Sequence, residues 1–100
     1  MKNFTKELTY KTSRSSGAGG QNVNKVETAV TVMWNPSKTE YFSIDEVELI
    51  LLKLKNRINI EGILQLTVSE SRTQLQNKKI ATDKIVELVD NAHLSAAKYG

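Results

Sequence analysis

The run Lys25-Val26-Glu27-Thr28-Ala29-Val30-Thr31-Val32-Met33-Trp34 alternates residue by residue, as a half-buried β-strand does. β-Branched and aromatic side chains, which favour strands, dominate it. One face would carry Val26, Thr28, Val30, Val32 and Trp34, and the other Glu27, Ala29, Thr31 and Met33. We therefore expect a strand over residues 25–34, with its valine-rich face in the core.

Residues 7–14, on the N-terminal side of this run, predict a second strand. Leu8, Tyr10 and Thr12 fall on one face of it, and polar or charged side chains fall on the other. Residues 15–24 separate the two strands and break the alternation with three glycines and small polar side chains.

On the C-terminal side, the sequence predicts a turn, a helix, a strand and a second helix. Asn35-Pro36-Ser37-Lys38 is typical of a turn, because proline fixes φ and removes a backbone donor. Ser43-Ile44-Asp45-Glu46 is a capping box, and the apolar stripe of the helix that it opens runs to Ile58. Residues 63–70 alternate again. Ser71-Arg72-Thr73-Gln74 has the form of another capping box, ahead of a final helix that runs to about Lys98.

This order of elements, ββαβα, predicts an α+β fold. A small, mostly antiparallel sheet with both helices packed on one face would bury all of the apolar stripes. The chain has 100 residues, of which 39% are hydrophobic and 25% charged, and that length favours a single domain over residues 1–100.

The composition also restricts the chemistry. Without cysteine, the chain can have no disulfide, thiol nucleophile or Cys-based zinc site, and its single histidine, His93, excludes mechanisms that need two. No apolar run approaches the roughly 20 residues that cross a bilayer, and the first residues lack the apolar region of a secretory signal. We therefore expect a cytoplasmic protein with no membrane partner.

The net charge of +3 is unevenly distributed. Residues 1–38 carry six basic side chains and two acidic ones, whereas residues 61–100 carry five of each. This bias is compatible with a phosphate-bearing partner and equally with an ordinary soluble surface.

The glycine-rich run Ser15-Ser16-Gly17-Ala18-Gly19-Gly20-Gln21-Asn22-Val23-Asn24 has no purely structural explanation. It joins two strands with ten residues, where a hairpin needs two to five. The run lacks the Gly-Lys-Ser/Thr of a P-loop. It also lacks the third glycine of a dinucleotide fingerprint, and a strand rather than a helix follows it.

Residues 16–26 resemble the Gly-Gly-Gln loop in the catalytic domain of class 1 peptide-chain release factors. The likeness is greatest to the small codon-independent relatives that rescue stalled ribosomes by hydrolysing peptidyl-tRNA. It extends to the residues on both sides, and Arg72-Thr73-Gln74-Leu75-Gln76-Asn77 is similar to the Arg-Ser-x-x-x-Asn stretch that opens the last helix in that family. Ala18 stands where release factors commonly have proline. Alanine also occurs at this position in the rescue branch of the family.

The resemblance implies a ribosome-dependent peptidyl-tRNA hydrolase whose catalytic residues are Gly19, Gly20 and Gln21. Glutamine has no titratable proton near neutral pH, so Gln21 cannot be a general base. It can position water and donate hydrogen bonds to developing negative charge. The two glycines, lacking Cβ atoms, would allow the backbone to enter a crowded RNA cavity.

The remaining site predictions concern RNA and the loop itself. Lys11, Arg14, Lys25 and Arg72 are the candidates for binding phosphates of tRNA or ribosomal RNA. Ser16, Gly17, Asn22 and Asn24 would support the loop. The partners would be peptidyl-tRNA and the RNA of the peptidyl-transferase centre, and we expect a monomer that needs no metal and no cofactor.

Two other functions stay open. The chain has no room for the domains that read stop codons, and it stops without the basic tail of the rescue relatives. It could therefore be a non-catalytic RNA- or ribosome-binding accessory module, or a fragment of a stop-codon-dependent release factor. A hydrolase that works without the ribosome is disfavoured, because a loop without acid, base or metal has little catalytic power in water.

Overall fold

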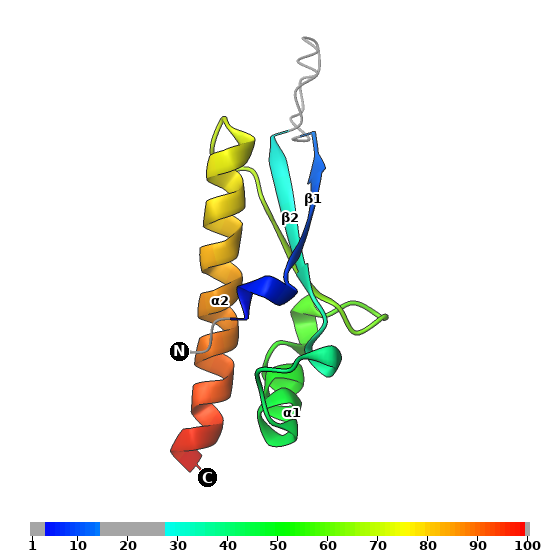
Figure 1. The fold of residues 1–100 in the computed structure, drawn as a ribbon, viewed down its shortest axis with the longest axis vertical. Coiled ribbons are helices and arrows are strands. Elements are labelled where there is room, and N and C mark those ends of the chain that lie inside the picture. The colour runs from blue at the N-terminus through cyan, green and yellow to red at the C-terminus, as the bar shows by residue number, and fades with distance from the viewer. Residues whose placement is uncertain (1–3, 15–27, 100) are drawn as a thin grey trace.

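The structure, a computed structural model, describes residues 4–14 and 28–99, with side chains up to residue 92. Three strands form an antiparallel sheet in the order β1-β2-β3, and two α-helices accompany it (Figure 1). The elements are η1 (Thr5–Glu7), β1 (Thr9–Ser13), β2 (Ala29–Trp34), η2 (Pro36–Lys38), α1 (Ile44–Lys53), η3 (Lys55–Arg57), β3 (Leu64–Val68) and α2 (Gln74–Tyr99), where η denotes a short 3₁₀ turn. The α+β fold predicted from the sequence is confirmed.

Strand β2 is the centre of the sheet, and its faces are those that the alternation predicts. Val30, Val32 and Trp34 are almost completely buried, at 2% exposure or less. Val32 lies opposite Tyr10 of β1 and Leu66 of β3. The described part of the strand predicted over residues 25–34 begins at Ala29, and residues 25–27 lie outside the description.

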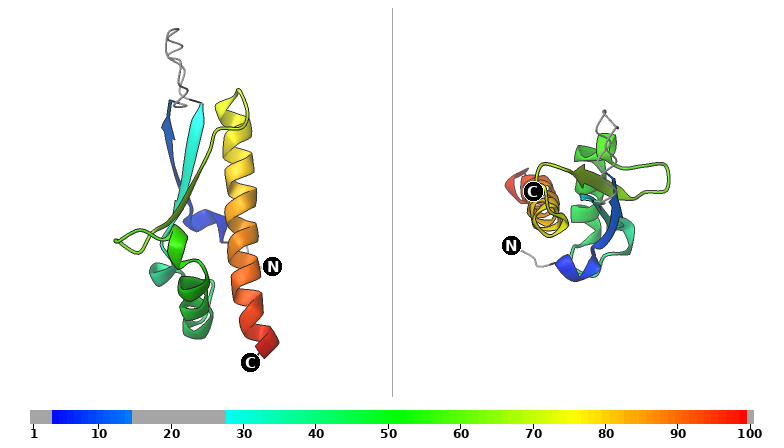
Figure 2. Two further views of the ribbon diagram at one scale, coloured as in Figure 1. Left: turned by 180° about the vertical axis from the view of Figure 1, so that it is seen from behind. Right: turned by 90° about the horizontal axis from the view of Figure 1, so that it is seen from above.

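Helix α2 covers one face of the sheet. Its buried residues recur at helical spacing and pack against the valines and leucines of β2 and β3: Ala81, Ile85, Val89 and Ala92. The helix is longer than the strands, and its C-terminal half continues past the end of the sheet to lie beside α1 (Figures 1 and 2). Ile50 of α1 and Leu54, the residue that follows the helix, thus complete the core at that end.

The first described residues belong to the core as well. Phe4, Trp34 and Phe42 form an aromatic cluster whose ring centroids lie 4.6–5.7 Å apart. Beside it, the Glu7 carboxylate accepts hydrogen bonds from Trp34 Nε1 at 2.9 Å, from the Thr39 hydroxyl at 2.6 Å and from the Glu40 N–H at 2.9 Å. Burial raises the pKa of Glu7, but the hydrogen bonds from Thr39, Trp34 and Glu40 outweigh burial and hold that pKa below its ordinary value of 4.5.

Glu7 should therefore make the protein sensitive to acid. Because the folded pKa is depressed, its contribution to stability is complete above the unfolded pKa and is lost as pH falls through the folded pKa. We expect Glu7→Gln to lower the free energy of unfolding by about 1–2 kcal/mol at neutral pH. The difference between the two proteins should shrink below about pH 4. Urea unfolding followed by circular dichroism measures it, and a difference that stays constant from pH 7 to about pH 3 would contradict the assignment.

Two predicted helix boundaries are wrong. The helix expected to reach Ile58 ends at Lys53; the chain continues as the 3₁₀ turn η3, and Ile58 instead forms a bridge to Leu64. Leu54 and Ile58 continue the apolar spacing only because both return to the same core. The second capping box is also misplaced: the cap of α2 is Thr73, whose hydroxyl accepts the N–H of Gln76 at 3.2 Å. The box at Ser43 and Glu46 is confirmed.

Candidate functional site

The glycine-rich segment connects β1 to β2, and the described residues on either side of it lie next to each other in the sheet. Ser13, the last residue of β1, lies opposite Ala29, the first residue of β2. The start of α2 lies at the same end of the molecule (Figure 1). We call this end, formed by residues 13–14, 28–29 and 71–77, the loop root. The predicted site residues within the segment lie outside the described residues, and their roles stay predictions: Ser16, Gly17, Gly19, Gly20, Gln21, Asn22, Asn24 and Lys25.

Asn77 connects the two parts of the loop root. Its side chain is completely buried. The Nδ2 group donates to the carbonyl oxygens of Thr28 at 2.7 Å and Ser71 at 3.1 Å, and Oδ1 accepts the N–H of Ser71 at 2.8 Å. One amide thus joins the residue that precedes β2 to the turn that precedes α2.

This role of Asn77 was not predicted from the sequence, although the sequence carries a signal for it. Asn77 stands four residues before Ala81, eight before Ile85 and twelve before Val89, so it occupies the apolar stripe of α2. A buried amide is tolerated at such a position only where its donors and acceptor are satisfied. An asparagine on an apolar stripe therefore predicts a backbone tie of this kind.

The turn before α2 is held by short-range hydrogen bonds. The Ser71 hydroxyl bonds to the Gln76 side chain and accepts the Thr73 N–H at 3.3 Å. Arg72 lies within this turn with its side chain exposed. Hydrogen bonds thus fix the loop root on the α2 side, and the exposed guanidinium of Arg72 extends from it toward solvent.

Strand β1 is fixed to α2 by Tyr10. The Tyr10 hydroxyl lies 2.7 Å from the hydroxyl of Thr82, and Lys78 Nζ lies 4.6 Å from the centroid of the tyrosine ring. Lys78 is a further cation near the loop root that the sequence analysis did not single out.

The structure describes three of the four predicted RNA-binding cations: Lys11, Arg14 and Arg72. Lys11 alternates with Tyr10, so it points to the face of the sheet that α2 leaves open, where it lies opposite Thr31. Arg14 follows β1, Arg72 precedes α2, and all three side chains are exposed. The structure places Arg14 and Arg72 at the loop root and Lys11 on the adjoining open face. Their role in binding RNA stays a prediction.

The described site contains no set of groups for acid–base or metal chemistry. Within residues 4–14 and 28–92, no cluster of three or more His, Cys, Asp or Glu side chains could hold a metal ion. Glu7, whose pKa is shifted, belongs to the aromatic cluster and not to the loop root. In the part of the chain that the structure describes, no helix is both long and apolar enough to cross a membrane. What this site offers is a rigid base for one segment, with cations around it.

Comparison with known proteins gives one family and several relatives. The family model for the RF-1 domain matches residues 3–99. The chain is 38% identical over 79 residues to the large ribosomal subunit protein mL62 of Mus musculus. It is 37% identical over 83 residues to the peptidyl-tRNA hydrolase ArfB of Pseudomonas putida, and 37% identical over 71 residues to peptide chain release factor 1 of Geobacter sulfurreducens.

These matches take in most of this chain and a smaller part of each relative. They span 79%, 83% and 71% of the chain, but 38%, 58% and 19% of the respective relatives. The chain thus corresponds to one part of proteins that are longer than it is.

Proposed function

Because this chain belongs to the RF-1 domain family, we propose that it hydrolyses the ester bond of peptidyl-tRNA on the ribosome. The observation that carries the proposal is Gly19-Gly20-Gln21 within the run from Ser16 to Val26, in a chain that matches the RF-1 domain almost from end to end. The similarity to a peptidyl-tRNA hydrolase, at 37% identity, supports the same reaction.

In the proposed reaction, the oxygen of a water molecule attacks the ester carbonyl of the nascent peptide. The bond from the carbonyl carbon to the 3′ oxygen of the tRNA breaks, and that oxygen takes up a proton as the peptide acid leaves. Negative charge develops on the carbonyl oxygen in the transition state, and the backbone N–H of Gln21 would stabilise it. The Gln21 side chain would orient the water.

The loop root gives this proposal a physical basis. A donor can lower a barrier only when it is held in place before the reaction starts. The strand pairing of Ser13 with Ala29 and the bond from Asn77 to Thr28 hold the described residues that flank the segment on the sheet and on α2. Arg14 and Arg72 stand at the same root, where they would neutralise RNA phosphates.

The finer parts of the proposal are that release needs no stop codon and that the protein acts as a single-domain monomer in the cytoplasm, without metal or cofactor. The second candidate is a non-catalytic module that binds ribosomal RNA. The exposed cations Lys11, Arg14 and Arg72 favour it, since they serve binding whether or not a reaction follows.

The test is peptide release from stalled ribosomes that carry labelled peptidyl-tRNA and no stop codon in the decoding site. We expect the purified protein to release the labelled peptide, and free peptidyl-tRNA in buffer to stay intact. Binding to the ribosomes without any release would favour the accessory module. Release that requires a stop codon would contradict codon independence.

A further inference from the structure

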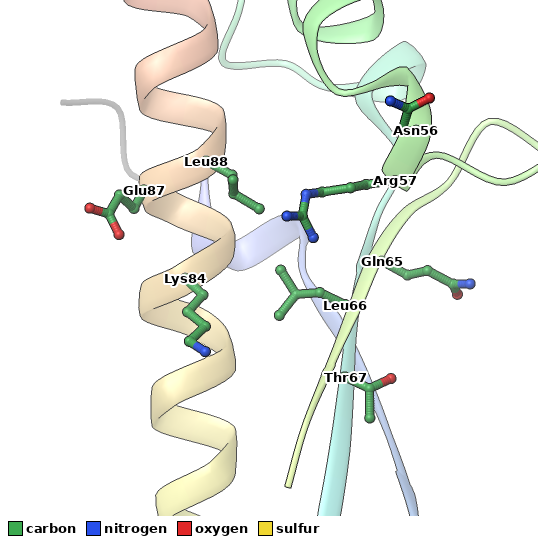
Figure 3. Close-up of a pocket in the computed structure, with 8 residues that line it drawn as sticks. All are labelled: Asn56, Arg57, Gln65, Leu66, Thr67, Lys84, Glu87 and Leu88. Atoms are coloured by element: carbon green, nitrogen blue, oxygen red, sulfur yellow. The ribbon is translucent and has the colours of Figure 1, made fainter. Parts of the chain in front are cut away.

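A groove lies between β3 and helix α2, away from the loop root. It has a volume of about 660 Å³ and is lined by residues of η3, β3 and α2 (Figure 3). Strand β3 is an edge strand of the described sheet, and no further strand of residues 4–14 and 28–99 pairs with it on this side.

The groove combines an apolar floor with two cations. Leu66 of β3 and Leu88 of α2 point toward each other across it. The guanidinium of Arg57 lies over this floor from the η3 side (Figure 3). Lys84 lines the groove from α2, and its side chain extends along the helix (Figure 3). Glu87 of α2 also lines the groove, and its carboxylate is directed away from Arg57 and Leu66 (Figure 3).

Both cations are available to a ligand. Within residues 4–14 and 28–92, Arg57 has no carboxylate within ion-pair distance. Lys84 pairs with Glu70 at 2.7 Å, but both side chains are about half exposed, at 49% and 57%. An exposed pair of this kind is worth little, so a stronger anion can replace Glu70.

We propose that this groove binds a segment of single-stranded RNA, with a phosphate on Arg57 and Lys84 and the adjoining ribose or base on Leu66 and Leu88. Guanidinium and phosphate match as a bidentate pair. Sites for single-stranded nucleic acid combine a positively charged groove with a surface that the bases cover. In this groove two leucines take the place that aromatic side chains usually have.

A polyanion of regular charge spacing fits better here than an isolated acidic group. Residues 53–57 contain three exposed cations, Lys53, Lys55 and Arg57, and no acid. They continue the positive charge from the groove along η3 toward the end of α1. The choice of RNA as the polyanion rests on the proposed function; the groove and its cations do not depend on it.

The test measures binding of a fluorescein-labelled 12-nucleotide oligouridylate by anisotropy, over a range of salt concentrations. We expect Arg57→Gln and Lys84→Gln each to raise Kd about three- to tenfold. Each should also reduce the slope of log K against log salt by about 0.7, the value for one lost phosphate contact on a single strand. Lys38→Gln is the matched control, because it removes the same charge from an exposed position on η2 and should change neither quantity.

A second measurement distinguishes RNA binding in the groove from non-specific binding to positive charge elsewhere on the surface. Titration with the oligonucleotide should shift the methyl resonances of Leu66 and Leu88, but not that of exposed Leu52 on α1. Variants that bind like the Lys38→Gln control, with unmoved Leu66 and Leu88 methyls, would overturn the proposal. So would loss of polyglutamate binding in Arg57→Gln while RNA binding persists, since the groove would then serve an acidic protein segment.

The release assay keeps this inference distinct from the proposed function. If both hold, Arg57→Gln should raise KM for ribosomes and leave kcat unchanged. RNA binding in the groove by a protein that releases no peptide would overturn the proposed function alone. If Arg57→Gln and Lys84→Gln release peptide normally and bind RNA as wild type does, the proposal of RNA binding in the groove is wrong and the proposed function stands.

Discussion

Gly20→Ala is expected to lower the rate of peptide release on saturated ribosomes at least about a hundredfold. The added Cβ would restrict the backbone beside Gln21 and shift the N–H that we propose to stabilise the transition state. Loss of one such aligned donor costs about 3–4 kcal/mol of barrier. Gln21→Ala should have a smaller effect, because it keeps the backbone N–H and removes only the side chain that orients water. Ribosome binding should be retained in both.

The matched control for this experiment is the same substitution at Gly62. Gly62 has a φ of 83°, and an added Cβ would meet nothing within 4 Å, so only the backbone strain counts. Gly62→Ala should lower the free energy of unfolding by about 1 kcal/mol and leave release intact. Gly20→Ala should leave stability within about 0.5 kcal/mol and abolish most release. Undiminished release by Gly20→Ala and Gln21→Ala would remove these residues from the mechanism.

Asn77→Ala should lower the free energy of unfolding by about 3 kcal/mol. The substitution leaves the Thr28 carbonyl and both backbone groups of Ser71 without their side-chain partner in a buried place. Lys79→Ala, at an exposed position two residues further along α2, is the control and should stay within about 0.5 kcal/mol. Urea unfolding at neutral pH measures both changes.

Asn77→Asp distinguishes lost donors from lost volume. It keeps the shape of the side chain and an acceptor for the Ser71 N–H, but it sets a charged oxygen against two carbonyl oxygens. Such a carboxyl has a raised pKa in the folded protein, so its destabilisation is full at neutral pH and diminishes as pH falls and the carboxyl is protonated. A difference from wild type that is small at pH 7, or that grows on acidification, would show that the donors of Asn77 do not hold the loop root.

The sequence predicted those features that depend on local periodicity. The faces of β2 follow from its alternating valines, and the start of α1 follows from the box at Ser43 and Glu46. The end of α1 could not be predicted in this way. Leu54 and Ile58 satisfy helical spacing, yet the chain leaves the α-helix at Leu54, because Ile58 pairs with Leu64 across a turn. That pairing depends on the turn over residues 59–63, which lies outside the stretch with helical spacing.

The same distinction applies to the functional residues. The Gly19-Gly20-Gln21 triplet stands out in the sequence because no strand or helix requires it. Asn77 acts through a carbonyl 49 positions away, and Arg57 joins Lys84 only when η3 is placed against α2. Sequence reasoning found the residues proposed to react, and the structure was needed to find those that hold or surround them.

The late position of α2 in the chain has a consequence for how the protein is made. Translation delivers the three strands and α1 first, and their apolar face, with Val30, Val32 and Leu64, then has no cover. The residues that seal it, Ala81, Ile85 and Val89, leave the synthesising ribosome only afterwards. The nascent chain therefore exposes the apolar face of the sheet until α2 emerges. Chaperones that hold apolar segments would act on it during that interval. A protein that we propose to rescue stalled ribosomes would thus itself depend on its own synthesis running through α2.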